Sequence, residues 1–164
     1  MERSSHDLAA ASRRLRVLQD ERAIRDTMAR YGQAIDSGDD TGWLACFAAD
    51  GEYDILYGDV EPSRVELGTR HPSGVLHRGS EQLAAFIAGH SRPPAGVHKH
   101  LMFEPLIELD GDTATVVSGY LRTDQVAGAP EVQSHGWYRD RFHRQPDGRW
   151  LIQRRLVDIR SVRR

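Results

Sequence analysis

Four strand-like segments in the second half of the chain are joined in pairs by tight-turn sequences. "VHKHLMFEPLIEL" and "TATVVSGYLRTDQV" flank "DGD", and "VQSHGWYRDRFHR" and "RWLIQRRLVDIR" flank "QPDG". Glycine and aspartate in a short link between two such runs indicate a β-hairpin, because they adopt the backbone angles that tight turns need. This half of the chain is therefore expected to form four long antiparallel strands.

A segment with the spacing of an amphipathic helix precedes these strands. Apolar residues recur at helical spacing on one face, at positions Val17, Ile24, Met28, Tyr31 and Ile35. The pattern begins near Ala11, and residues 1–10 are expected to be frayed. "DSGDD" at residues 36–40 should end this helix, because Gly38 favours a helix C-terminus and the aspartates can cap the helix that follows.

Two shorter helices and one strand are expected between residues 41 and 90. "TGWLACFAAD" predicts a short helix with Trp43 and Phe47 on one side, and "DGEYDILYG" predicts a turn and a strand. "GSEQLAAFIAGH" predicts a third helix, with Ser80 as its N-cap and Gly89 at its end. Residues 59–78 contain prolines, glycines and charges, and they are expected to form a long loop of the kind that often serves as a binding lid.

Helices followed by a strand meander predict an α+β fold, with the helices packed on one face of a curved, mainly antiparallel sheet. Three N-terminal helices in the concavity of this sheet would give a cone-shaped α+β barrel that encloses a pocket. The sequence has no internal repeat, so residues 1–164 are expected to form one domain with a solvated basic tail at residues 160–164.

Composition excludes several function classes. The formal net charge is −2, with 28% charged and 39% hydrophobic residues, so there is no excess of positive charge for nucleic acid. The sequence contains no long apolar run and no signal peptide, which predicts a cytoplasmic protein that is not embedded in a membrane. Cys46 is the single cysteine, and its apolar surroundings favour a buried packing role.

Two histidines, His98 and His100, stand at the start of the first long strand of the second half. Residues two apart in a strand face the same side, so both histidines should share a face with Met102. The opposite face would carry Lys99, Leu101 and Phe103. Three interpretations are open: solvent-exposed side chains at a strand start, a pair of metal ligands, or a catalytic base with a neighbour.

A metal site needs more ligands than this pair supplies. Catalytic zinc takes three protein ligands and keeps one position open. His135 or Asp124 could provide the third ligand, but neither has a diagnostic spacing. We therefore expect no metal and no other cofactor.

A carboxylate–histidine dyad is the alternative chemistry. Histidine is a good general base near neutral pH, because its unperturbed pKa is roughly 6.5. A carboxylate bonded to one ring nitrogen fixes the tautomer and stabilises the imidazolium that forms. Asp36 could supply this carboxylate, although aspartate in "DSGD" is also typical of a helix end or turn. Tyr31 lies on the apolar helical face, where its hydroxyl needs a partner or a ligand.

Three stretches of the chain resemble the SnoaL-like group of the nuclear-transport-factor-2-like superfamily. They are "YGQAIDSGDDTGWLACFAADGEYDI", "VHKHLMFEPLIELDGDTATVVSGYL" and "GWYRDRFHRQPDGRWLIQRRLVDI". The resemblance spans roughly residues 15–160 and is specific for the fold rather than the reaction, because this cone fold hosts unrelated activities. Members include scytalone dehydratase, bile-acid dehydratase, a dehydrochlorinase, polyketide cyclases and non-catalytic small subunits of ring-hydroxylating dioxygenases.

The resemblance implies roles for three residues. In the dehydratases, a tyrosine on the first helix is followed five residues later by an aspartate, and a histidine opens the strand before the hairpin. These positions match Tyr31, Asp36 and His100 here. His98 has no assigned counterpart. The second histidine of scytalone dehydratase falls near Asp124, which argues against scytalone as the substrate.

The resulting hypothesis is a cofactor-independent lyase or isomerase of the dehydratase type, acting on a small cyclic or polyketide-like substrate. His100, oriented by Asp36, would abstract a proton from a carbon next to a carbonyl group. Tyr31 would bond to the oxyanion or protonate a departing hydroxyl, and His98 would bind substrate or relay the proton. Residues expected to line the apolar pocket are Trp43, Tyr53, Tyr57, Phe86 and Met102.

Two alternatives remain open at this level. One is a polyketide cyclase, which would share the dyad but form a carbon–carbon bond. The other is a non-catalytic ligand-binding protein similar to the dioxygenase small subunits. The resemblance also implies a homo-oligomer, either a dimer or a trimer, that pairs through the outer face of the sheet.

Overall fold

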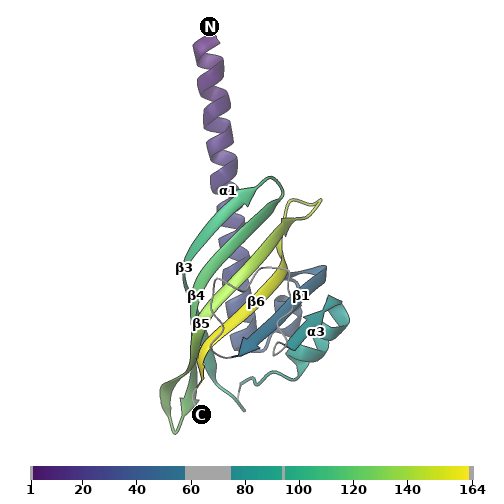
Figure 1. Cartoon of the computed structure of the whole chain (residues 1–164), viewed down its shortest axis with the longest axis vertical. Helices are drawn as coiled ribbons and strands as arrows, with labels where there is room; N and C mark the ends of the chain where they lie inside the picture. Colours follow the sequence, from purple (N-terminus) through teal and green to yellow (C-terminus); the bar gives the residue numbers. More distant parts are fainter. Residues whose placement is uncertain (1, 58–74, 94, 163–164) are drawn as a thin grey trace.

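The fold combines three helices with six strands, and a computed structural model describes residues 2–57, 75–93 and 95–162 (Figure 1). The predicted α+β class is confirmed. The helices are α1 (Glu2–Ser37), α2 (Asp40–Leu44) and α3 (Gly79–Ala88). The strands are β1 (Phe47–Tyr57), β2 (Val75–Arg78), β3 (His98–Asp110), β4 (Thr113–Val126), β5 (Ala129–Arg144) and β6 (Trp150–Val162).

The six strands form one sheet in the order β2-β1-β6-β5-β4-β3. The four long strands are antiparallel as predicted, whereas β1 runs parallel to β6. The sheet is mixed and open, with β2 and β3 at its edges, so it is a curved sheet rather than a closed barrel. The second half of α1 packs against it, and α3 packs against β1 and β2 (Figure 1).

Helix α1 is longer than its apolar pattern indicated. It begins at Glu2 instead of near Ala11, whereas the fraying of residues 1–10 stays a prediction. Its N-terminal part extends well beyond the sheet (Figure 1), and Val17 is therefore 46% exposed. The apolar stripe is buried from Ile24 to Ile35, where the helix lies against the sheet.

The helix ends and caps predicted in the first half of the chain are partly correct. Gly38 follows α1 with a φ of +75°, a left-handed conformation that glycine adopts without steric cost. The Asp39 carboxylate then caps α2 by accepting a 2.9 Å hydrogen bond from the Gly42 N–H. Phe47 begins β1 and is not part of the second helix.

The region between β1 and α3 differs from the predicted loop. Val75–Arg78 forms strand β2, which pairs with β1, so the prediction of a loop through residue 78 is wrong at its end. The part of the predicted lid at residues 59–74 lies outside the described residues. Ser80 does not cap α3, because its hydroxyl donates to the Ala49 carbonyl at 3.1 Å. Gly89 ends the helix as predicted.

A bulge in β3 controls which residues face the helices. Pairing with β4 shifts by one residue between Phe103 and Leu106, and Glu104 there has a φ of +53°. A one-residue shift exchanges the two faces of a strand. His98 and His100 before the bulge, and Ile107 and Leu109 after it, therefore all face inward although their spacing departs from strict alternation.

A buried ion pair links the last two strands. The Arg155 guanidinium donates to both Asp140 carboxylate oxygens at 2.8 and 2.6 Å, and both residues are fully buried. The guanidinium also lies 4.0 Å from the Tyr31 ring centre and 4.3 Å from that of Tyr138. Arg155 is therefore a core residue, and β6 continues to Val162, whereas the solvated tail at residues 160–164 stays a prediction.

Two other sequence predictions concern burial and membranes. Cys46 is buried, and burial raises the pKa of its thiol to about 11, so the thiol stays protonated at neutral pH. Within residues 2–57, 75–93 and 95–162, no helix combines the length and apolar character needed to cross a membrane.

Candidate functional site

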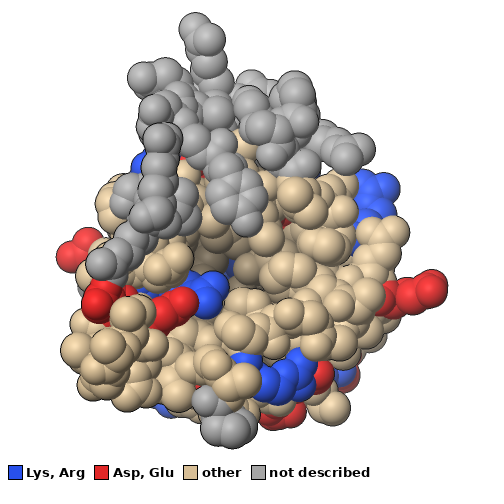
Figure 2. Space-filling model, turned by 90° about the horizontal axis from the view of Figure 1, so that it is seen from below, with Lys and Arg blue, Asp and Glu red and all other residues tan. Residues whose placement is uncertain are grey.

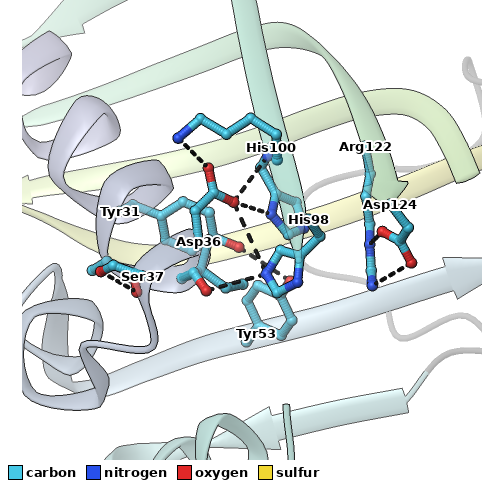
Figure 3. A network of polar contacts seen from close by, with 11 residues as sticks. Tyr31, Asp36, Ser37, Tyr53, His98, His100, Arg122 and Asp124 are labelled. Carbon is cyan, nitrogen blue, oxygen red and sulfur yellow. Dashed lines mark hydrogen bonds and ion pairs between the residues drawn. The ribbon is translucent and has the colours of Figure 1, made fainter. Parts of the chain in front are cut away.

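The site centres on a hydrogen bond between the end of α1 and the start of β3. Asp36 lies in the last turn of α1, and His100 is the third residue of β3. The Asp36 Oδ1 accepts from the His100 ring nitrogen Nδ1 at 2.8 Å and from the His100 backbone N–H at 2.9 Å (Figure 3). Both side chains are nearly buried, with 6% and 7% of their surfaces exposed. The two residues singled out in the sequence are thus in direct contact.

Lys99 contributes to the same site, contrary to expectation. Its backbone position directs it to the other face of β3, but its ammonium group reaches the Asp36 Oδ2 at 3.1 Å. Because β3 is an edge strand, a long side chain can extend around it. Both oxygens of Asp36 therefore have cationic or N–H partners.

The protonation states follow from these contacts. Burial raises the pKa of Asp36, but the hydrogen bonds from His100 and Lys99 outweigh it and leave the pKa below its ordinary value. Burial lowers the pKa of His100 more than the Asp36 carboxylate raises it. Near pH 7 the pair therefore combines an ionised carboxylate with a neutral imidazole. Because a carboxylate accepts, Nδ1 carries the proton and Nε2 carries the free lone pair of a general base.

These pKa directions predict the pH dependence of any reaction that uses His100 as a base. The base is active above its folded-state pKa, which lies below the ordinary 6.5. Activity should thus persist at pH 6.5 and fall only under more acidic conditions. A rate profile against pH, together with an NMR titration of the His100 ring protons, would check this. A loss of activity that begins above pH 7 would contradict the assignment of His100 as a base with a lowered pKa.

His98 is held inside the protein rather than directed at an open space. Its Nε2 donates to the Ile35 carbonyl at 3.2 Å and lies 4.0 Å from the Asp36 Oδ1. Its side chain is 1% exposed, and Nδ1 has no hydrogen-bond partner among the described residues. This geometry suits a residue that fixes the end of α1 against β3, beside the dyad.

Asp36, His98 and His100 could also hold a metal ion, since one ligand atom from each lies within 4.8 Å of the others. Two features oppose this use. Lys99 places a positive charge 3.1 Å from the Asp36 carboxylate, where a second cation would be repelled. The Asp36 Oδ1 already accepts two N–H groups of His100. The arrangement is better suited to proton transfer than to cation binding.

Two spaces flank the dyad, and His100 borders both. An outer groove of about 460 Å³ lies between α1 and β3, where Asp36, Lys99 and Met102 are among its walls. An inner cavity of about 170 Å³ lies on the concave side of the sheet. The end of the molecule seen from below is hollowed, with Lys or Arg atoms beside the hollow (Figure 2). The inner cavity is lined by Tyr53, Ile55, Phe86, His90, His100, Tyr120, Arg122, Ser134, Tyr138, Val157 and Ile159.

The predicted pocket residues divide between these spaces and the core. Tyr53 and Phe86 line the inner cavity, whereas Met102 borders the outer groove. Trp43 is fully buried and packs against Phe47, with ring centres 4.6 Å apart, so it is a core residue rather than a cavity wall. Tyr57 ends β1, and its side chain lies outside the described part of the structure.

Tyr31 lies behind the cavity wall. It is fully buried, and its hydroxyl donates to the Tyr53 hydroxyl at 3.2 Å. Burial raises the pKa of Tyr53 well above its usual range, so Tyr53 remains a hydrogen-bond donor at neutral pH. Of these two tyrosines, Tyr53 lines the inner cavity, and Tyr31 supports it from behind through the hydrogen bond to its hydroxyl.

His90 and Arg122 line the inner cavity but were not among the site residues predicted from the sequence. His90 follows the end of α3, and its ring centre lies 5.0 Å from that of His98 and 6.0 Å from that of His100. Burial, followed by the charge of Arg122, lowers the pKa of His90 to about 4. A single histidine after a helix carries no local signal. Arg122 is one strand away from His100, and only the pairing of β3 with β4 reveals that it faces the same space.

Comparisons with solved structures give the same fold. An NTF2-like protein with a cystatin-like fold from Novosphingobium aromaticivorans is 28% identical, with a TM-score of 0.74, and the match covers 91% of this chain and 87% of the other. A variant of Rv3472, a Mycobacterium tuberculosis protein of unknown function, is 28% identical with a TM-score of 0.70, over 88% of this chain and 79% of the other.

A third structure shows the fold alone. It is the β subunit assigned to an aromatic-ring-hydroxylating dioxygenase from Novosphingobium aromaticivorans, with 21% identity, a TM-score of 0.73, and coverage of 90% of this chain and 93% of the other. A search of curated proteins finds no match. The family model for the SnoaL-like domain matches residues 16–156. The chain therefore belongs to the SnoaL-like domain family.

Proposed function

We propose that the protein is a cofactor-independent lyase or isomerase that removes a proton from a carbon next to a carbonyl group. The observation that carries this proposal is the 2.8 Å contact between the Asp36 carboxylate and the Nδ1 of His100 beside the inner cavity. Because the two ring nitrogens point in different directions, Nε2 is turned away from Asp36. A neutral, oriented and nearly buried imidazole is a suitable general base.

The proposed step begins with the Nε2 of His100 taking the proton. The electron pair of the broken C–H bond forms a double bond between that carbon and the carbonyl carbon, and the π pair of the carbonyl moves to its oxygen, which becomes an enolate oxygen. Asp36 stabilises the imidazolium, and the Tyr53 hydroxyl, supported by Tyr31, can donate to the enolate. In a dehydration, the enolate reforms the carbonyl, the C–O bond at the β-carbon breaks, and the departing hydroxyl takes the proton from the His100 imidazolium to form water. In an isomerisation, the proton returns to a different carbon.

Proton exchange offers a test that does not require the natural substrate. The purified protein is incubated in D₂O near pH 7 with cyclohexanone, and NMR follows deuterium incorporation next to the carbonyl. A parallel reaction uses 3-hydroxycyclohexanone, which gives cyclohexenone and water, and ultraviolet absorbance follows the product. Exchange or dehydration above the buffer rate would support the proposal. An absence of both reactions would contradict it for small cyclic ketones.

A binding subunit without chemistry is the second candidate, and the outer face of the sheet favours it. Leu101, Phe103 and Trp137 remain 48%, 46% and 42% exposed there, and such apolar groups often mark a protein contact. Phe103 on β3 and Trp137 on β5 both pair with Gly119 of β4, which lies between these two strands. The two aromatic residues therefore lie on the same face of the sheet. Co-purification with a larger chain, combined with no proton exchange, would favour this candidate. A polyketide cyclase differs by forming a carbon–carbon bond, which product analysis would reveal.

A further inference from the structure

The inner cavity contains one charged side chain among its described lining residues, and that residue is Arg122. We propose that Arg122 binds an ionised oxygen of the ligand, so that the inner cavity accepts a small organic anion, namely a single-ring carboxylate. This inference rests on the proposed function and extends it, because it names the class of molecule that would lie against His100.

The pairing of β3 with β4 places Arg122 directly beside His100. The two residues are register partners, and opposite residues of an antiparallel pair point to the same face of the sheet. Figure 3 shows Arg122 on the other side of His100 from Asp36. A ligand in the inner cavity would therefore meet the imidazole on one strand and the guanidinium on the next.

The Arg122 guanidinium is held in place by a carboxylate of the same strand. Arg122 donates through Nε and one Nη to the two carboxylate oxygens of Asp124, at 2.7 and 3.1 Å. Only 24% of the Arg122 side chain is exposed. Two hydrogen bonds to one carboxylate fix the plane of the guanidinium. The second Nη nitrogen, which does not bond to Asp124, keeps its N–H donors for a ligand. A pre-oriented arginine loses little conformational entropy when it binds a carboxylate.

The rest of the cavity lining is complementary to the ring of such a ligand. Ile55, Phe86, Val157 and Ile159 supply apolar surface, and tyrosine and serine hydroxyls supply neutral hydrogen-bonding groups. The volume of about 170 Å³ is below the roughly 300 Å³ at which drug-sized ligand pockets begin. The space therefore suits one ring with a small substituent rather than a long chain or a fused system.

The position of Arg122 also fits the proposed chemistry. Besides burial, its positive charge lowers the pKa of His100, which keeps the imidazole neutral and able to accept a proton. The same charge would stabilise an oxygen that becomes negative as the proton leaves. An anionic substrate would partly offset the charge of Arg122, so binding should raise the pKa of His100 toward its ordinary value.

Benzoate and benzamide form a matched pair of probes, because they share size and shape but differ in charge. Isothermal titration calorimetry at pH 7 and low salt would measure both on the wild type and on Arg122→Gln, Arg122→Lys and Arg141→Gln. Arg141 is exposed on β5, so its variant removes the same charge far from the cavity. We expect the wild type and Arg141→Gln to bind benzoate equally. Arg122→Gln should bind it at least about tenfold more weakly, and Arg122→Lys should be intermediate.

Three results would overturn the proposal: no benzoate binding by the wild type, equal affinity for benzoate and benzamide, or unchanged benzoate affinity in Arg122→Gln. The last result would mean that Arg122 serves only as a partner for Asp124. If Arg122→Gln does not fold, the comparison of benzoate with benzamide and the Arg122→Lys variant still decide the question. His100→Ala separates this proposal from the proposed function, because it should lower proton exchange by about 10²- to 10⁴-fold while the variant still binds benzoate more tightly than benzamide.

Discussion

Substitution of His100 by alanine is expected to lower proton exchange by about 10²- to 10⁴-fold, the usual contribution of a positioned general base. Asp36→Asn should cause a loss in the same range, because the amide cannot stabilise the imidazolium and favours the wrong ring tautomer. Both side chains are nearly buried and form a 2.8 Å hydrogen bond with each other. Water therefore cannot easily take the place of the imidazole or the carboxylate in a variant. The measurement is the rate of deuterium incorporation into cyclohexanone for each variant.

His135→Ala is the matched control for this experiment. His135 is exposed on β5, and its removal should leave exchange unchanged. Circular dichroism and thermal unfolding of each variant would separate a catalytic loss from a structural one, because Asp36 also accepts the backbone N–H of His100. Wild-type exchange in either His100→Ala or Asp36→Asn would remove the dyad from the mechanism.

The largest effect on stability is expected at Arg155. Arg155→Met should lower the free energy of unfolding by about 3–5 kcal/mol, because it leaves the Asp140 carboxylate buried without its partner. Both side chains are fully buried, and the Arg155 guanidinium also packs against the rings of Tyr31 and Tyr138. Urea or guanidinium unfolding followed by circular dichroism would measure the change.

Arg149→Met provides the comparison, since Arg149 forms an ion pair with Asp147 at the surface, where both side chains are more than half exposed. Its loss should cost no more than about 1 kcal/mol. The double variant Arg155→Met with Asp140→Leu should recover part of the lost stability if the unpaired charge is the cause. A loss below about 1 kcal/mol in Arg155→Met alone would show that the buried pair contributes little.

Two local sequence patterns and a family resemblance together predicted a pair formed by Asp36 and His100, and the structure places these two side chains in contact. Asp36 follows an apolar helical face, and His100 shares a strand face with His98 and Met102. Both patterns depend on short spacing, which the backbone geometry of helices and strands determines. The 2.8 Å contact joins residues sixty-four positions apart, and packing of α1 against β3 produces it.

Other features could not be derived in this way. Lys99 was expected to point away from Asp36, but the edge position of β3 lets its side chain reach the carboxylate. Trp43 was expected in the pocket, but the packing of α2 places it in the core. The buried pair of Arg155 and Asp140 was not predicted, because the two residues lie on neighbouring strands and only the pairing of β5 with β6 brings them together.

The sequence by itself determined the four-strand meander, the helices before it and the shared face of His98 and His100, because these depend on repeats of two and 3.6 residues. Only the tertiary structure decided which residue stands beside His100. The hairpin register, extended from Asp110 and Thr113 without interruption, would place Thr123 opposite His100. The bulge near Glu104 shifts the pairing by one residue and places Arg122 there instead. A single extra residue exchanges the faces of a strand, and this backbone distortion sets the charge of the cavity.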